Sequence, residues 1–166
     1  MPAPGQHTHR HAEVVAGLRL LEVGPGTGYY AVDTADRVGE AGHLDLLDLQ
    51  PEMLDHTLRE AGRRGLAARM TATQGDAQAL PYPDAAFDGA YIALALGEVP
   101  DQVAALRELA RVVRRGGPVV VGELFGDPHM VTSRRLRERA LLAGLEVQHR
   151  VGPRAGSFTV LRHAPG

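Results

Sequence analysis

Short apolar runs alternate with longer stretches of helical spacing along almost the whole chain. Runs bounded by glycine or aspartate predict strands at Arg19–Val23, His43–Asp48, Arg69–Gln74, Phe87–Leu94, Pro118–Leu124, Leu145–Val151 and Ser157–Leu161. The stretches between them predict helices at Thr27–Val38, at Pro51–Arg64, at 102–113 with Asp101 as the N-cap, and from Thr132 or Ser133 to Gly144. This alternation indicates an α/β fold with a mainly parallel sheet covered on both faces. Only residues 152–156 separate the last two strands, so we expect an antiparallel hairpin at one edge.

The length of 166 residues suits one domain, which we place at residues 12–166 behind a polar, mobile leader at residues 1–11. We interpret His7, His9 and His11 in this leader as incidental rather than as a metal site. The sequence contains no secretory signal and no run of about 20 apolar residues. We therefore expect a cytoplasmic protein without an integral membrane segment.

The composition excludes several kinds of chemistry. The chain has no Cys, which excludes thiol nucleophiles, thiolate metal sites and disulfides. Every basic residue is Arg, so Schiff-base chemistry and a Walker-type phosphate loop, which need a lysine amine, are excluded as well. The net charge of −2 gives no indication of a nucleic-acid partner. We interpret the arginines of residues 134–139 as a solvated helix face.

The strongest local motif is the segment Glu22–Gly28, in which a predicted strand runs into three glycines at alternate positions. Gly24 permits a tight turn, Gly26 lets a ligand lie against bare backbone, and Gly28 lets the following helix start close to the sheet. The N–H groups at such a helix start favour a negatively charged ligand atom. The alternative interpretation is a tight turn that binds nothing.

The ligand expected at this turn carries a ribose. Asp48 ends the second predicted strand, where a carboxylate can accept both hydroxyl hydrogens of a ribose, although it could instead cap the helix at Pro51. The glycine spacing differs from the G-x-G-x-x-G of dinucleotide sites. Glu22 beside the loop would repel a pyrophosphate and suits an ammonium or sulfonium centre. Asp48 alone would also fit NAD, so a nicotinamide-dependent oxidoreductase stays as an alternative.

Several motifs in this order resemble the class I S-adenosylmethionine-dependent methyltransferases, in particular the ubiquinone/menaquinone-biosynthesis-like group. The segments that carry the resemblance are Glu22–Gly28, Asp48–Leu54, Gly75–Ala77, Leu80–Asp84, Phe87–Asp88, Val99–Asp101 and Leu106–Gly117. The resemblance extends from about Val15 to the end of the chain. It implies a Rossmann-like three-layer sandwich with seven strands in the order 3-2-1-4-5-7-6 and an antiparallel seventh strand.

The resemblance also implies roles for individual residues around S-adenosyl-L-methionine. Gly24, Pro25, Gly26 and Gly28 would line its methionine end, and Glu22 would help to hold its ammonium group. The remaining cofactor contacts would come from Asp48 on the ribose, Leu49 on the adenine face, Asp76 and Ala77 on the adenine edge, and Ala93 near the sulfonium. Asp76 could instead be a loop cap.

The acceptor is expected to be a small molecule of the quinone- or lipid-like kind, bound by loops after the fourth and fifth strands. Candidate bases are His129, because imidazole titrates near neutral pH, and the carboxylates Glu98 and Glu123. Glu98 stands where related enzymes often have a histidine, which leaves the base unassigned. Tyr29 and Tyr30 could wall the pocket or pack against the sheet.

Fewer than 20 residues precede the glycine strand, whereas related enzymes usually carry a helical region there. We therefore expect a shortened N-terminal cap and an open cofactor cleft, or one covered by a partner such as a second copy in a homodimer. The alternative function is a non-catalytic protein that binds S-adenosylmethionine or S-adenosylhomocysteine.

Overall fold

The computed structural model describes residues 16–152 and 156–166, and these form one seven-stranded sheet in the order β3-β2-β1-β4-β5-β7-β6. The strands are β1 (Arg19–Val23), β2 (His43–Asp48), β3 (Met70–Gln74), β4 (Gly89–Ala93), β5 (Val119–Leu124), β6 (Leu145–Val151) and β7 (Gly156–His163). Strands β1 to β5 are parallel, and β7 pairs antiparallel with both β5 and β6. The predicted order and the edge hairpin are therefore confirmed. The predicted leader and its histidines lie outside the described residues.

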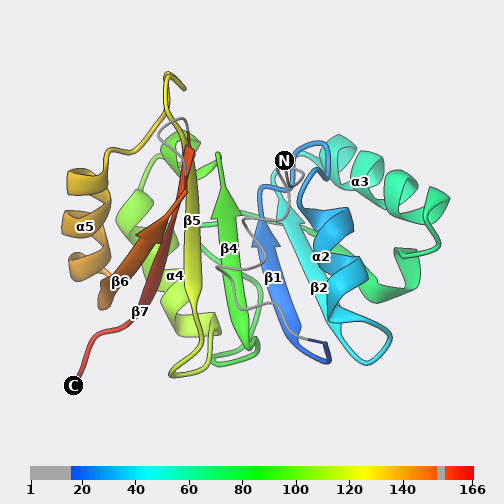
Figure 1. The fold of residues 1–166 in the computed structure, drawn as a ribbon, viewed down its shortest axis with the longest axis horizontal. Coiled ribbons are helices and arrows are strands. Elements are labelled where there is room, and N and C mark those ends of the chain that lie inside the picture. The colour runs from blue at the N-terminus through cyan, green and yellow to red at the C-terminus, as the bar shows by residue number, and fades with distance from the viewer. Residues whose placement is uncertain (1–15, 153–155) are drawn as a thin grey trace.

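Helices cover both faces of this sheet, as the alternating pattern predicts. The helices are α2 (Ala31–Val38), α3 (Pro51–Arg63), α4 (Gln102–Val112) and α5 (Ser133–Leu142). One buried cluster joins α2 and α3 to side chains such as Leu44 and Tyr91. The other joins α4 and α5 to the opposite face, through side chains such as Ile92 and Val121. In Figure 1, α2 and α3 lie toward β2, whereas α4 and α5 lie toward β6.

The first helix begins later than the sequence suggests, and this prediction of a helix from Thr27 is wrong. Gly26 and Gly28 both have positive φ angles, of 53° and 81°, which an α-helix does not contain. The Gly28 N–H donates to the carbonyl of Pro25 over 2.8 Å, which closes a turn instead. As a result, the regular helix starts at Ala31, after Tyr30.

The other helices begin and end close to their predicted positions because their terminal signals are local. The Asp101 carboxylate accepts a hydrogen bond from the Ala104 N–H over 2.9 Å, which confirms it as the N-cap of α4. Pro51 occupies the first turn of α3. The Thr132 hydroxyl accepts from the Arg135 N–H at the start of α5. Two short 3₁₀ turns were not predicted, η1 (Ala67–Arg69) and η2 (Leu96–Glu98).

Arg111 on α4 fastens the loop before β4 to the helical layer. Its guanidinium donates to the carbonyl of Leu80 over 3.0 Å, to the carbonyl of Tyr82 over 2.8 Å and to the carboxylate of Glu108. The Glu108 carboxylate also accepts from the Leu80 N–H over 2.7 Å. Hydrogen bonding to Glu108 and Asp84 raises the pKa of Arg111 further above its usual value, so the guanidinium stays charged. This network fixes the segment that follows the third strand.

Within residues 16–152 and 156–166, no helix is both long enough and apolar enough to cross a membrane.

Candidate active site

A cavity of about 580 Å³ opens at the carboxyl ends of β1, β2 and β4. It lies where the strand order reverses between β1 and β4, which is where open α/β sheets bind ligands. Its lining comes from the glycine turn after β1, the segment after β2, the loop after β3 and the segment after β4. Those residues are Glu22–Thr27, Tyr29, Tyr30, Leu47–Gln50, Met53, Gly75–Gln78, Ile92–Ala95 and Glu98–Pro100.

The glycines of the turn have different structural roles. A Cβ on Gly24 would lie 2.7 Å from the Cβ of Ala95, so this glycine lets the segment after β4 approach. A Cβ on Gly26 would meet no atom of the described chain within 4 Å, and this glycine lines the cavity. Gly26 is therefore the position at which backbone is left bare for a ligand.

Gly28 does not line the cavity, although the resemblance implied a place for it there. A Cβ on Gly28 would lie 2.8 Å from Cγ2 of Thr57, because the turn packs directly on α3. The Thr57 hydroxyl also donates to the carbonyl of Gly26 over 3.2 Å. Gly28 thus lets the turn pack on α3 and does not face the cavity.

Glu22 is a buried carboxyl group at the cavity floor, with 1% of its surface exposed. The Tyr91 hydroxyl donates to Glu22 Oε2 over 2.7 Å and lies 2.9 Å from Thr34 Oγ1. Burial raises the pKa of Glu22 to about 8, and the hydrogen bond from Tyr91 opposes this shift. A cationic ligand group beside it would favour the ionised form.

Asp48 lies at the end of β2, on the cavity wall. Its Oδ1 accepts a hydrogen bond from the Gln50 N–H over 2.9 Å, which orients the carboxylate. A carboxylate has about four acceptor positions, so most of its capacity remains for hydroxyl groups of a ligand. The next residue, Leu49, lines the same wall and is 63% exposed, which leaves an apolar surface for a flat ring.

Asp76 also lines the cavity, and it is held by Gln78, a residue that the sequence analysis missed. The backbone N–H of Gln78 donates to Asp76 Oδ1 over 2.8 Å, and its side-chain amide donates to both carboxylate oxygens. These bonds lower the pKa of Asp76. The Gln78 side-chain oxygen accepts from the Asp101 N–H over 3.0 Å, which links this wall to the start of α4. The neighbouring Ala77 is buried and also lines the cavity.

The three candidate bases are not brought together. Glu98 lies in η2 and lines the cavity, near Ala93 at the end of β4. His129 is exposed and lies outside the lining. His129 contacts Gly97, the residue before Glu98, through its backbone carbonyl and not through its imidazole. This carbonyl lies so close to Gly97 that a Cβ at position 97 would have no room.

Glu123 also lies outside the cavity lining. Its Oε2 accepts from the Val131 N–H over 3.1 Å. Burial raises the pKa of Glu123 to about 7, opposed by the Val131 N–H. Among the three candidates, only Glu98 can therefore reach a molecule inside the cavity without rearrangement.

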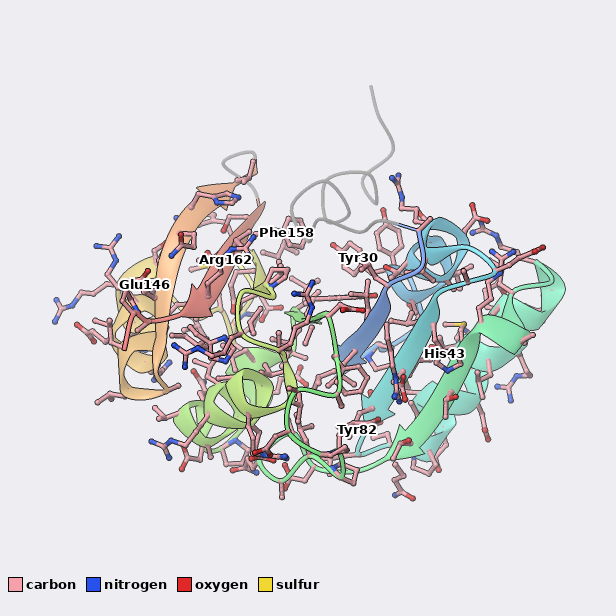
Figure 2. The ribbon with its side chains drawn as sticks, turned by 90° about the horizontal axis from the view of Figure 1, so that it is seen from below. Tyr30, His43, Tyr82, Glu146, Phe158 and Arg162 are labelled. Atoms are coloured by element: carbon pink, nitrogen blue, oxygen red, sulfur yellow. The ribbon has the colours of Figure 1, made fainter. Side chains whose placement is uncertain are left out.

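Two tyrosines close the cavity next to the glycine turn. Tyr29 and Tyr30 both line it, and their rings meet edge to face with centroids 5.0 Å apart. The Tyr30 ring also meets the ring of Phe158 on β7 edge to face, with the two centroids 5.9 Å apart. Figure 2 shows Tyr30 and Phe158 on one side of the sheet and Tyr82 on the other. The tyrosines thus serve both as pocket wall and as packing against the sheet.

The charges around the cavity are all of one sign. The ionisable carboxyl groups that line it are Glu22, Asp48, Asp76 and Glu98, and no lining residue of the described chain is basic. Such a lining disfavours a pyrophosphate and favours a ligand with positive charge.

Comparison with known proteins places this site in a family. The model of the family described as "Methyltransferase domain" matches residues 20–117, which include the glycine turn and the segments after β2, β3 and β4. A ubiquinone/menaquinone biosynthesis C-methyltransferase UbiE from Cellvibrio japonicus is 39% identical over 116 residues, covering 70% of this chain and 46% of that protein. The protein of the same name from Xanthomonas campestris pv. campestris is 41% identical over 112 residues, covering 68% and 44%. The chain thus spans less than half the length of these relatives.

Solved structures share the fold at low sequence identity. A SAM-dependent methyltransferase from Aquifex aeolicus has a TM-score of 0.88 and 19% identity, over 97% of this chain and 90% of that chain. The [4+2]-cyclase SpnF has a TM-score of 0.84 and 22% identity, over 98% and 80%. The second likeness shows that the fold alone does not specify the reaction. Together with the match of the family model to residues 20–117, the strand order identifies the chain as a member of the methyltransferase domain family with the class I S-adenosylmethionine-dependent methyltransferase fold.

Proposed function

We propose that the protein transfers the methyl group of S-adenosylmethionine to a small, quinone- or lipid-like acceptor. The observation that carries this proposal is the cavity at the glycine turn, which is lined by four carboxyl groups and, within residues 16–152 and 156–166, by no basic residue. S-adenosylmethionine bears an ammonium and a sulfonium centre, which this lining attracts, whereas NAD bears a pyrophosphate that it repels. Membership of the methyltransferase domain family supports the same choice.

The roles that we propose follow the cavity from one end to the other. Glu22 and the bare backbone at Gly26 receive the amino-acid end of the ligand. Asp48 accepts hydrogen bonds from both ribose hydroxyls, and Leu49 packs on one face of the adenine. Asp76, oriented by Gln78, accepts from the adenine amine. Each group is on the cavity wall, in this order along the carboxyl edge.

When bound, S-adenosylmethionine would supply an electrophilic methyl group on a positively charged sulfonium sulfur, and this charge would be lost on transfer of the methyl group to an acceptor atom in line with the carbon–sulfur bond. The task of this chain is therefore to align the two molecules in near contact and to exclude water. Ala93 and Ala95 give a small, weakly polar wall at the reacting centre, which suits a reaction that removes charge. Glu98 is the carboxylate placed to take a proton from the acceptor.

The acceptor class rests on two observations. The curated relatives that match 68–70% of this chain are named as quinone-biosynthesis C-methyltransferases. The acceptor side of the cavity offers Tyr29, Leu94 and Val99, and the described part of the chain contributes no cationic residue to it that would bind a carboxylate or phosphate.

The test is calorimetric titration with S-adenosylmethionine, followed by transfer of labelled methyl to reduced 1,4-naphthoquinone. We expect the parent chain to bind and Asp48→Ala to lose roughly 5- to 150-fold in affinity, about 1–3 kcal/mol, because the ribose hydroxyls lose their acceptor. Asp55→Ala removes an exposed carboxylate on α3 outside the cavity and serves as the control. The proposal fails if NADH binds more tightly than S-adenosylmethionine or if both variants bind like the parent.

A further inference from the structure

We infer that Leu94 is the residue that selects the acceptor, and that it selects an uncharged, apolar molecule. This inference rests on the proposed methyl transfer, because it assigns the acceptor side of the same cavity. It does not depend on which atom of the acceptor is methylated.

The backbone at Leu94 adopts a conformation that a leucine normally avoids. Its φ angle is 60°, and Ala85 is the only other non-glycine residue with a positive φ in the part of the chain that the structure describes. In this left-handed region the Cβ approaches the following carbonyl oxygen, so a large side chain is disfavoured. Such strain persists only where the surroundings impose it, and it concentrates at functional sites.

Contacts on both sides impose this conformation. The Leu94 N–H donates to the carbonyl of Gly122 on β5 over 2.9 Å. On one flank, the Cβ of Ala95 lies against the glycine turn, 2.7 Å from where a Cβ on Gly24 would stand. On the other, Cα of Ala93 lies 3.3 Å from where a Cβ on Gly122 would stand. Gly24 directly after β1 and Gly122 in β5, the two strands that flank β4, thus leave room for the segment 93–95.

A glycine at position 94 would adopt the same backbone without strain. A leucine at this position must have a side-chain role that offsets the backbone strain. Packing in the core is not this role, because the Leu94 side chain lines the cavity and is 40% exposed. At the end of the neighbouring strand, Leu124 and Phe125 are also exposed, by 46% and 74%. The hydrogen bond between Leu94 and Gly122 joins these two strand ends, although among these three side chains only Leu94 lines the cavity.

The charge of the lining narrows the ligand class further. Glu98 lines the cavity as Leu94 does, and no lining residue of the described chain carries positive charge. An anionic acceptor would lose its hydration there without gaining a partner. An apolar, uncharged molecule replaces water at Leu94 without that loss.

The experiment measures binding of an uncharged fluorescent probe, N-phenyl-1-naphthylamine, to the full chain saturated with S-adenosylhomocysteine. We expect Leu94→Gly and Leu94→Asn, both compatible with a positive φ, to weaken probe binding at least tenfold. Their affinity for S-adenosylmethionine should stay within twofold of the parent. We also expect the anionic analogue 1-anilinonaphthalene-8-sulfonate to bind the parent at least tenfold more weakly than the uncharged probe.

Ala85→Gly is the matched control, because it relieves the other positive φ at an exposed position outside the cavity lining. We expect it to leave probe binding unchanged. The inference is overturned if both Leu94 variants keep the parent's probe affinity, if Ala85→Gly weakens it equally, or if the anionic analogue binds as well as the uncharged probe. Failure of the parent to bind S-adenosylmethionine would instead refute the proposed function.

Discussion

Glu22 is buried and lies at the floor of the cavity, and this burial determines the pKa of its carboxyl group. Tyr91 gives the carboxyl group a hydrogen-bond partner, but the loss of hydration dominates and raises its pKa to about 8. In the unfolded chain the pKa of a glutamate lies near its ordinary value of 4.5. The folded protein therefore holds a proton at this site over a pH range in which the unfolded chain does not.

This difference predicts how stability depends on pH. Between about pH 4.5 and pH 8 the folded state binds more protons, so the Glu22 contribution makes the free energy of unfolding fall as pH rises, by at most about 1.4 kcal/mol per pH unit. Above about pH 8 the contribution is constant. Glu22→Gln should remove this fall while still accepting from Tyr91. Denaturant titrations of the parent and of Glu22→Gln from pH 5 to pH 9 measure this dependence. If the free energy of unfolding changes with pH in the same way in both proteins, the raised pKa of Glu22 is contradicted.

The turn after β1 is the element on which the site depends, and its glycines should respond differently to substitution. Gly26→Ala adds a Cβ that meets no atom of the described chain, so we expect a loss of only about 1–2 kcal/mol of stability from its positive φ. Gly28→Ala adds the same kind of strain and a clash with Thr57, for a loss of about 2–5 kcal/mol.

Ligand affinity should show the opposite order, because Gly26 faces the cavity and Gly28 does not. Denaturant unfolding and calorimetry with S-adenosylmethionine, performed on both variants, separate the two effects. Equal losses of stability, or a larger loss of affinity in a folded Gly28→Ala variant, would show that these roles are assigned the wrong way round.

Arg111 links another element, the segment between β3 and β4, to helix α4. Arg111→Gln should lower the free energy of unfolding by about 1–3 kcal/mol, because the carbonyls of Leu80 and Tyr82 lose their donor. Arg107→Gln on the same helix loses a single bond to the Leu142 carbonyl and is the control, with an expected change within about 0.5 kcal/mol. Chemical denaturation of the two variants decides whether the network stabilises the fold.

At the scale of the whole molecule, the pattern of apolar runs allowed all seven strands and the antiparallel edge hairpin to be predicted, whereas the strand order was implied by the resemblance to class I methyltransferases. Helix ends with local signals, such as Asp101, were also predictable. The start of α2 was not, because the conformation of Gly26 and Gly28 depends on contacts with Thr57 on α3, which is distant in sequence. The left-handed backbone of Leu94 likewise depends on neighbours distant in sequence.

The site residues also divide into features that the local sequence predicts and features that depend on contacts distant in sequence. The end of β5 was predicted at the correct edge, yet Glu123 does not line the cavity. Its carboxylate accepts instead from the Val131 N–H, a contact with the segment before α5 that strand periodicity does not reveal. Gln78 also carried no signal, since its role appears only when the loop after β3 meets the start of α4.

The most direct test of the central claim is a crystal structure of the protein soaked with S-adenosylhomocysteine. The expected density fills the cavity, with both ribose hydroxyls within hydrogen-bond distance of the Asp48 carboxylate and the adenine ring against Leu49. Density at any other place on the molecule, or an Asp48 carboxylate turned away from the sugar, would contradict this assignment of the site.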